Sequence, residues 1–153
     1  DIIINLQGDM PNIKPSAITA LASYMKQGKC DIGTLASDFS KKDEIANPNV
    51  VKVAVKNKLS ENIFLNALDF FREKKNLNEN LYHHIGIYAF TNKALMRYVS
   101  LKRSILEIER KLEQLRALEN DMSVHVGYIE SSPLSVDTEE DLIEIKKIME
   151  NKK

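Results

Sequence analysis

Asp9 lies where a buried strand ends and is the first residue in the chain suited to binding a metal ion. Four of the first six residues are apolar, and they run directly into Gln7-Gly8-Asp9. Gly8 permits a sharp exit, and Pro11 stops the strand. Open α/β sheets bind ligands beyond the carboxyl ends of their strands. A carboxylate there can hold a hard cation and, through it, nucleotide phosphates, although it could equally cap a turn.

Asp137, far along the chain, is the second candidate acid. Thr138 and Asp141 approximate a capping box at the start of the last predicted helix. That cap does not need the carboxylate of Asp137, which is therefore available for a ligand. The alternative role is a favourable interaction with the helix dipole, worth about 0.3–1 kcal/mol.

The elements that must position these acids alternate between strands and helices. Apolar runs predict strands over residues 1–6, 31–37, 50–55, 63–71, 82–90 and 123–129. Apolar spacing and caps predict helices around residues 18–25, 92–100, 104–119 and 142–148. The first strand has the composition of a buried strand in a parallel sheet, which needs neighbours and covering helices. Because the chain begins with Asp1 inside such a strand, we expect an upstream part of the fold to be missing.

Residues 104–119 form the clearest predicted helix. Its apolar residues recur every three or four positions, and Glu107 and Lys111 are placed for an i,i+4 ion pair. The remaining face carries charged and amide side chains. Such a face is usually solvated, although it could contact a partner helix.

The strand over residues 82–90 contains adjacent histidines, His83 and His84. Neighbouring residues of a strand point to opposite faces, which disfavours a metal site made of both. Each is expected to be a hydrogen-bonded, partly buried imidazole. Gly86 indicates a bulge or a close backbone approach. Lys52, within another β-branched run, either extends its ammonium to water or directs it at an anionic ligand.

Composition excludes several classes of protein. A chain of 153 residues favours one domain, and 22 basic against 22 acidic residues argue against a generally cationic surface for nucleic acid or membranes. No apolar run approaches a membrane span. The single cysteine, Cys30, can form neither an internal disulfide nor a cysteine-based zinc site, which fits a reducing compartment.

Five blocks, in order, resemble signature segments of the 3-deoxy-manno-octulosonate (KDO) cytidylyltransferases. They are Asn5-Leu6-Gln7-Gly8-Asp9-Met10-Pro11, Asn47-Pro48-Asn49-Val50-Val51-Lys52-Val53, His84-Ile85-Gly86-Ile87-Tyr88-Ala89-Phe90, Leu112-Glu113-Gln114-Leu115-Arg116 and Ser135-Val136-Asp137-Thr138-Glu139-Glu140-Asp141-Leu142. Each block is weak alone, but together they span nearly the whole chain. The related CMP-sialic acid synthetases match less well because they lack the helix that resembles LEQLR.

The resemblance implies a reaction in which CTP and KDO give CMP-KDO and pyrophosphate with magnesium. It implies that Asp9 and Asp137 are the catalytic magnesium ligands and that Gln7 lies beside nucleotide and sugar. The positions that resemble the family's sugar pocket are His84, Tyr88, Glu113 and Gln114. Directional hydrogen bonds from such side chains suit a polyhydroxylated acid.

Two departures from the family pattern concern anion binding. The basic, glycine-containing nucleotide loop of the RLPGKPL kind is absent from this sequence, so weak CTP binding is expected. The family's Phe-Ser-Arg segment aligns with Leu65-Asn66-Ala67, and Phe71 replaces its proline. Ala67 therefore stands where an arginine would contact the acid sugar.

The sequence thus predicts an α/β, nucleotide-diphospho-sugar-transferase-like three-layer fold with a mixed, mainly parallel sheet, N-terminally incomplete. Residues 1–153 would form the C-terminal portion of a single cytidylyltransferase domain. We expect a cytoplasmic homodimer of the lipopolysaccharide pathway, joined through the strand around residues 83–90 and the 104–119 helix, with no nucleic-acid or membrane partner. The alternatives are an inactive or split remnant that only dimerises, and a nucleotidyltransferase for another sugar acid.

Overall fold

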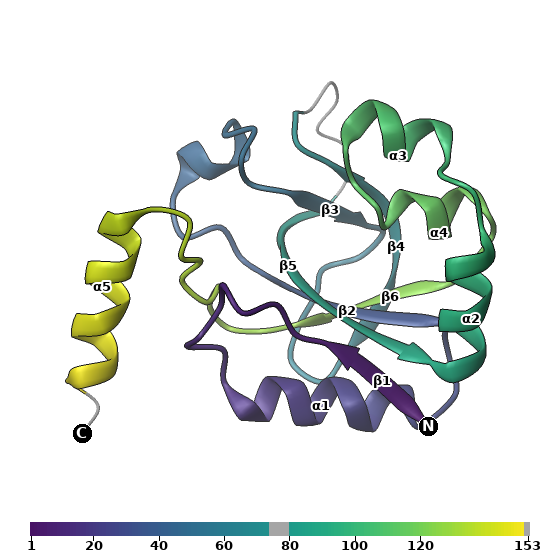
Figure 1. Ribbon diagram of the computed structural model, residues 1–153, viewed down its shortest axis with the longest axis horizontal. Coiled ribbons are helices and arrows are strands. Elements are labelled where there is room, and N and C mark those ends of the chain that lie inside the picture. The colour runs from purple at the N-terminus through teal and green to yellow at the C-terminus, as the bar shows by residue number, and fades with distance from the viewer. Residues whose placement is uncertain (74–79, 152–153) are drawn as a thin grey trace.

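The computed structural model describes residues 1–73 and 80–151, which form one sheet flanked by helices (Figure 1). The strands are β1 (Ile2–Asn5), β2 (Ile32–Ser37), β3 (Lys52–Val55), β4 (Phe64–Phe71), β5 (Asn80–Thr91) and β6 (Val124–Tyr128). The helices are α1 (Pro15–Met25), α2 (Asn92–Ser100), α3 (Ile105–Arg110), α4 (Leu115–Glu119) and α5 (Glu139–Glu150), with a 3₁₀ turn at Lys42–Ile45. Each predicted strand and helix region contains at least one of these elements.

The sheet has the order β1-β5-β2-β6-β4-β3, and β5 also pairs with β3. It is mixed, as predicted, but the expectation of a mainly parallel sheet is wrong for the described strands, in which only β2 and β6 pair in parallel. The reason is that β5 runs opposite to both β1 and β2 and lies between them. Consequently β1, β2 and β6 share one direction, and their carboxyl ends lie at the same edge of the sheet.

The expected parallel neighbour of β1 is not among the described strands. This strand ends the strand order and pairs antiparallel with β5, and Ile3 is 38% exposed. A short run of isoleucines is compatible with a parallel or an antiparallel neighbour, so composition alone could not identify the adjoining strand.

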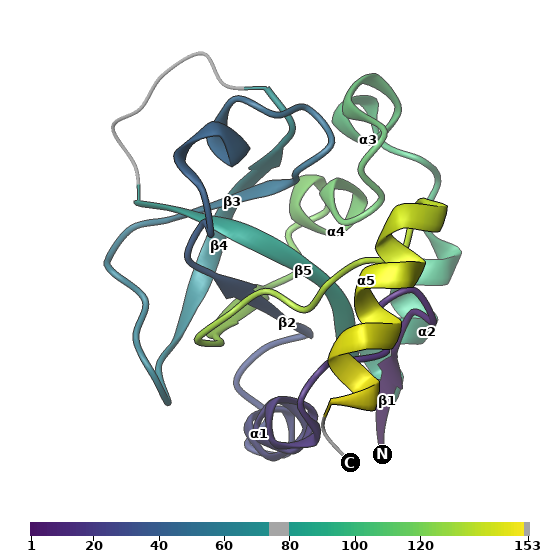
Figure 2. The same cartoon turned by 90° about the vertical axis from the view of Figure 1, so that its left-hand side faces the viewer.

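Helices lie on both sides of the sheet and give the three predicted layers (Figure 2), and an apolar cluster packs on each face of the sheet. On one face, Leu21 and Met25 of α1 pack against residues of β2 and β5. On the other, Ala94 of α2 and Leu115 of α4 join the larger cluster. Helix α1 has the predicted apolar stripe, and Gly28 follows it with a positive φ of 67°.

The predicted single helix over residues 104–119 is wrong, because it is divided into α3 and α4 (Figure 1). Lys111 takes a left-handed conformation with φ 56° and interrupts the helix. Ile105 and Ile108 of the expected apolar stripe are 79% and 55% exposed. Glu107 does not pair with Lys111, since its carboxylate is bound by Arg116.

Strand β5, which was expected in a dimer contact, is largely paired within the chain. It pairs with β2 on one side, and on the other with β3 at residues 80–83 and with β1 at residues 88–91. Among the described helices, none has the length and apolar character needed to cross a membrane.

Candidate functional site

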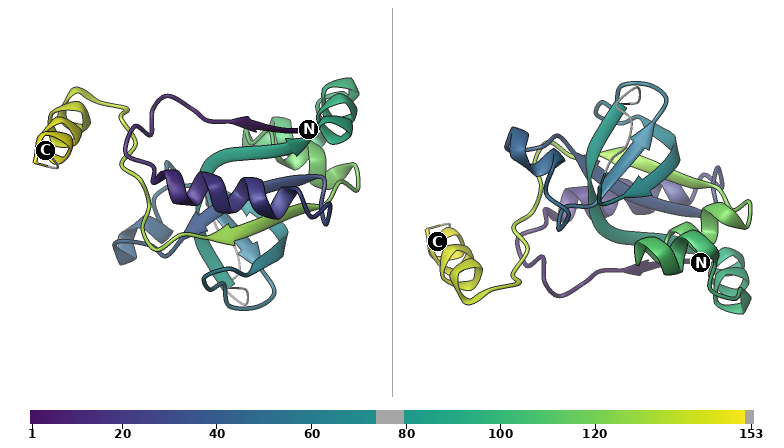
Figure 3. Two further views of the ribbon diagram at one scale, coloured as in Figure 1. Left: turned by 90° about the horizontal axis from the view of Figure 1, so that it is seen from below. Right: turned by 90° about the horizontal axis from the view of Figure 1, so that it is seen from above.

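The two predicted acids, Asp9 and Asp137, lie close together although 128 positions separate them in the chain. The segment after β1 and the segment before α5 run side by side (Figure 3), and the Val136 amide donates to the Asp9 carbonyl at 2.9 Å. The hydroxyl of Ser135 lies 3.4 Å from Oδ2 of Asp9 and 3.1 Å from Oδ2 of Asp137. Both carboxylates therefore converge on one hydroxyl group.

This acid pair has more acceptor atoms than the nearby donors can satisfy. The Ser135 hydroxyl has one proton, so it can donate to only one of the two carboxylates at a time. Oδ1 of Asp9 is buried and has no hydrogen-bond partner among the described residues. Convergent carboxylate oxygens with unused lone pairs fit a hard divalent cation such as Mg²⁺.

The acid pair alone would leave most positions around such a cation for other ligands. Within the described part of the chain, no group of three or more His, Cys, Asp or Glu side chains is placed to hold a metal. Mg²⁺ is commonly bound through one or two carboxylates, with water and substrate phosphates supplying the rest. The arrangement therefore suits a metal that arrives with a phosphorylated ligand.

All five predicted substrate-binding residues line one pocket of about 600 Å³, called here the polar pocket. They are Gln7, His84, Tyr88, Glu113 and Gln114. Gln7 precedes Asp9 by two residues and so connects the polar pocket to the acid pair. The pocket combines amide, imidazole, phenol and carboxylate groups, which can bind several hydroxyls of one ligand.

His84 is held in one orientation by Thr34. Thr34 Oγ1 lies 2.7 Å from the carbonyl of Ile87, to which it donates its single proton, and 2.8 Å from Nε2 of His84. Nε2 must therefore carry a proton and donate it to Thr34, which leaves Nδ1 as the acceptor. Burial lowers the pKa of His84 to about 3, so the ring is neutral at physiological pH.

A bulge in β5 shapes the strand next to His84. The register against β2 jumps between Thr34, paired with Tyr88, and Leu35, paired with Ile85, so Gly86 and its neighbour form the predicted bulge. Bulges are common beside active sites because they redirect side chains. Burial raises the pKa of the Tyr88 hydroxyl well above its usual range, so this group stays protonated and can donate.

Lys52 fits neither of its two expected roles. Its side chain is fully buried, and Nζ donates at 2.6 Å to the carbonyls of Asn47 and Arg72. The ammonium therefore reaches neither water nor a ligand, and it joins two segments at the rim of the polar pocket, where Asn49 and Arg72 lie. Burial lowers the pKa of Lys52. Ala67 does not line this pocket.

Sequence reasoning missed several residues of the polar pocket. Asn49, Arg72, His83, Arg103, Glu107, Lys111 and Arg116 also line it. Two of them had a signal, because Asn49 and Arg116 belong to blocks that carried the family resemblance. Of the others, Glu107 and Lys111 belong to the divided 104–119 segment and Arg103 precedes it. Arg72 follows β4, and His83 lies in β5 beside His84.

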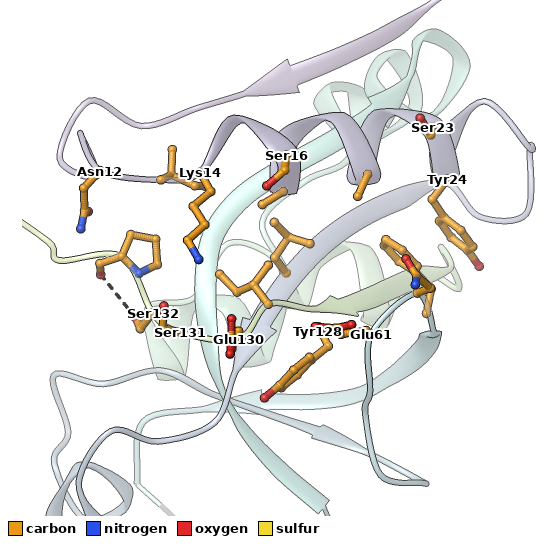
Figure 4. A pocket seen from close by; sticks show the side chains of 18 of the residues that line it. Asn12, Lys14, Ser16, Ser23, Tyr24, Glu61, Tyr128, Glu130, Ser131 and Ser132 are labelled. Carbon is orange, nitrogen blue, oxygen red and sulfur yellow. Dashed lines mark hydrogen bonds between the residues drawn. The ribbon is translucent and has the colours of Figure 1, made fainter. Parts of the chain in front are cut away.

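A second cavity, of about 550 Å³, lies between α1 and the segment after β6 (Figure 4). Lys14 and Ser16 line its α1 side, and Tyr128 and Glu130 line the opposite side (Figure 4); the apolar Leu35 also lines it. None of the predicted site residues lines this cavity. The candidate site is therefore the polar pocket together with the acid pair.

Comparison with known proteins gives a consistent set of relatives. The family profile described as Cytidylyltransferase matches residues 1–124. The 3-deoxy-manno-octulosonate cytidylyltransferase of Bartonella bacilliformis is 43% identical over 148 residues, which is 96% of this chain and 60% of the relative. The protein of the same name from Rhizobium meliloti is 46% identical over 150 residues, covering 97% and 59%. The chain thus spans about 60% of the length of these relatives.

Solved structures agree with this result. The structure of CMP:2-keto-3-deoxy-manno-octonic acid synthetase complexed with CTP matches with a TM-score of 0.86 and 30% identity. That match covers 100% of this chain and 63% of the other. Apo-UDP-glucose pyrophosphorylase shares the fold alone, with a TM-score of 0.66 at 15% identity, covering 99% of this chain and 55% of that one.

Proposed function

The chain belongs to the cytidylyltransferase family, and from this premise we propose that it provides the metal-binding and sugar-binding part of an enzyme that joins CTP and 3-deoxy-manno-octulosonate. The products would be CMP-KDO and pyrophosphate, for lipopolysaccharide synthesis. The observation that carries the proposal is the convergence of two groups of residues from distant blocks. Five residues share the polar pocket, and Asp9, which follows one of them by two residues in the chain, converges with Asp137 on Ser135.

In the proposed reaction, the anomeric hydroxyl of the sugar acid releases its proton to solvent and its oxygen forms a bond to the α-phosphorus of CTP, while the bond from that phosphorus to pyrophosphate breaks. Negative charge grows on the phosphate oxygens as this happens. Mg²⁺, when held by Asp9 and Asp137, would supply the positive charge that offsets it. Because Asp9 follows Gln7 by two residues in the chain, sugar and nucleotide would meet where the acid pair adjoins the polar pocket.

The residues of the polar pocket would orient the sugar. Neutral His84 offers Nδ1 as an acceptor for a sugar hydroxyl, since Nε2 is occupied with Thr34. Tyr88 would donate from its protonated hydroxyl, whereas Glu113 would accept. Gln114 can do both. Because these side chains come from β5 and from the segment between α3 and α4, they would surround the sugar from two sides.

Two measurements test this proposal. Pyrophosphate release is followed with CTP, Mg²⁺ and KDO, and binding of KDO to the chain is measured by calorimetry. We expect KDO binding that is weakened at least tenfold by His84→Ala, and turnover that is abolished by Asp137→Asn. Thermal-shift measurements with other sugar acids provide the specificity control. Stronger stabilisation by another sugar acid than by KDO would contradict the assigned substrate.

We further propose that the protein is a homodimer in the cytoplasm. Exposed apolar side chains gather on α2 and α3, where Met96, Val99, Ile105 and Ile108 are 63%, 60%, 79% and 55% exposed. A contact that covers these residues would remove them from water. The free, buried thiol of Cys30 is compatible with a reducing compartment. Light scattering of Ile105→Asp should give half the mass of the wild type, and a monomeric wild type would contradict the proposal.

A further inference from the structure

The segment of residues 111–114 joins two helices that are too short to be stable by themselves. Helix α3 has six residues and α4 has five, whereas isolated helices below about 12 residues are marginal in water. At the start of this linker, Lys111 is in the left-handed region with φ 56° and ψ 45°, which is uncommon for a residue other than glycine. Because the linker carries Glu113 and Gln114 into the polar pocket, other contacts must determine its position.

An ion pair joins the two helices on either side of the linker. Arg116 of α4 binds Glu107 of α3 with both ends of its guanidinium, Nε at 2.9 Å from Oε2 and Nη2 at 2.6 Å from Oε1. Glu107 is only 3% exposed, and its Oε2 also accepts from the Ser104 amide at 2.9 Å. A buried bidentate pair is directional and fixes the geometry of both partners. The pair therefore limits how far α3 and α4 can separate.

Tyr98 of α2, a third helix, contacts both Arg116 and the linker between α3 and α4. The guanidinium carbon of Arg116 lies 4.8 Å from the centre of the Tyr98 ring. The Tyr98 hydroxyl donates to the carbonyl of Glu113 at 2.9 Å. The backbone of the linker is thus held directly at the residue whose side chain faces the polar pocket.

We propose that Tyr98, Glu107 and Arg116 are positioning residues for sugar-acid recognition, which act by holding Glu113 and Gln114 in place. This inference rests on the proposed function, because it assigns these residues to the same site. Arg116 lines the polar pocket, but its Nε and Nη2 are engaged by the carboxylate of Glu107 and its guanidinium lies over the ring of Tyr98. Its contribution to binding would therefore be indirect, through the linker.

The first test examines the linker without any ligand, by hydrogen exchange of the backbone amides of residues 112, 115 and 116. Tyr98→Phe removes only the hydroxyl, and Arg116→Lys keeps the charge but loses the bidentate geometry. We expect each variant to speed exchange of these amides at least threefold. Tyr128→Phe is the matched control, because it removes a hydroxyl bound to Asp38 at 2.7 Å, outside the polar pocket. Unchanged exchange in both variants would overturn the inference.

The second test measures KDO binding by calorimetry in two backgrounds. In the wild type, Tyr98→Phe and Arg116→Lys should weaken binding at least fivefold. In the Glu113→Ala/Gln114→Ala background, they should have no further effect, because the residues they position are gone. The same fivefold loss in both backgrounds would mean that Arg116 binds the sugar directly and would overturn the positioning role.

These tests separate failure of the inference from failure of the proposed function. A wild-type chain that does not bind KDO contradicts the proposed function, and the exchange measurement alone then decides whether Tyr98 and Arg116 hold the linker. A wild-type chain that binds KDO with an affinity unaffected by Tyr98→Phe and Arg116→Lys overturns the inference and leaves the proposed function standing.

Discussion

Replacing His84 by glutamine should make the protein more resistant to acid. Burial lowers the pKa of His84 from an ordinary 6.5 to about 3 in the folded protein. The unfolded chain therefore takes up a proton below about pH 6.5, while the folded protein does not until about pH 3. Proton uptake by the unfolded chain alone favours unfolding, so stability falls as pH decreases between these values.

The size of this effect follows from the difference between the two pKa values. At pH 5 the unfolded state is about 1.5 pH units below its pKa, and the folded state is still neutral. At about 1.36 kcal/mol per unit, His84 alone should cost about 2 kcal/mol of unfolding free energy relative to pH 7.5. Glutamine does not titrate, and its amide can still donate to Thr34.

The assay is urea denaturation of the wild type and of His84→Gln at pH 7.5 and pH 5. We expect the variant to lose about 2 kcal/mol less than the wild type between these two values of pH. His83→Gln is the matched control on the same strand. Burial also lowers the pKa of His83, but Glu44 opposes that shift, so this control should recover less stability. Equal losses in the wild type and in His84→Gln would refute the assigned protonation state.

Three further predictions concern stability. Gly127→Ala should destabilise the fold by about 1–3 kcal/mol, because a Cβ there would lie 2.5 Å from the Phe64 ring, which is stacked on Tyr24. An unchanged urea midpoint would contradict this prediction. Thr138→Ala should cost about 1 kcal/mol and fray the start of α5, whose capping box uses that hydroxyl, as measured by helicity and urea denaturation. The hydrogen bond from Arg116 lowers the pKa of Glu107, so this carboxylate stabilises the fold at neutral pH. Its contribution to the unfolding free energy should disappear as pH falls below the ordinary carboxyl range. Arg116→Met should raise the Glu107 pKa in an NMR titration.

The sequence predicted most elements because the apolar spacing of each element agreed with the capping or turn residues at its ends. Helix α1 has both a stripe and a terminating glycine, and α5 has the predicted capping box of Thr138 and Asp141. Strand pairing was harder to predict. The residues of β5 give no indication that the strand lies between β1 and β2 and reverses the local direction of the sheet.

The candidate site was predictable where a motif was local and was not where contacts were long-range. The polar pocket gathers the five residues named from the blocks, and their roles there remain predictions. The partners of these residues could not be identified in advance. Thr34 contacts His84 from a strand 50 residues away, and Tyr98 contacts Glu113 from another helix. The regular apolar period gave no sign of the break at Lys111, which has a φ of 56° and is followed by Leu112 in the larger apolar cluster.

The most direct test of the account is binding of Mn²⁺, a paramagnetic substitute for Mg²⁺, followed by NMR in the presence of CTP. We expect the amide signals of residues 8–10 and 135–138 to broaden together, and Asp9→Asn or Asp137→Asn to abolish the broadening at both segments. Asp38→Asn, at an acid outside the pair, should leave it unchanged. Broadening at one segment only, or broadening that survives both substitutions, would contradict a shared metal site.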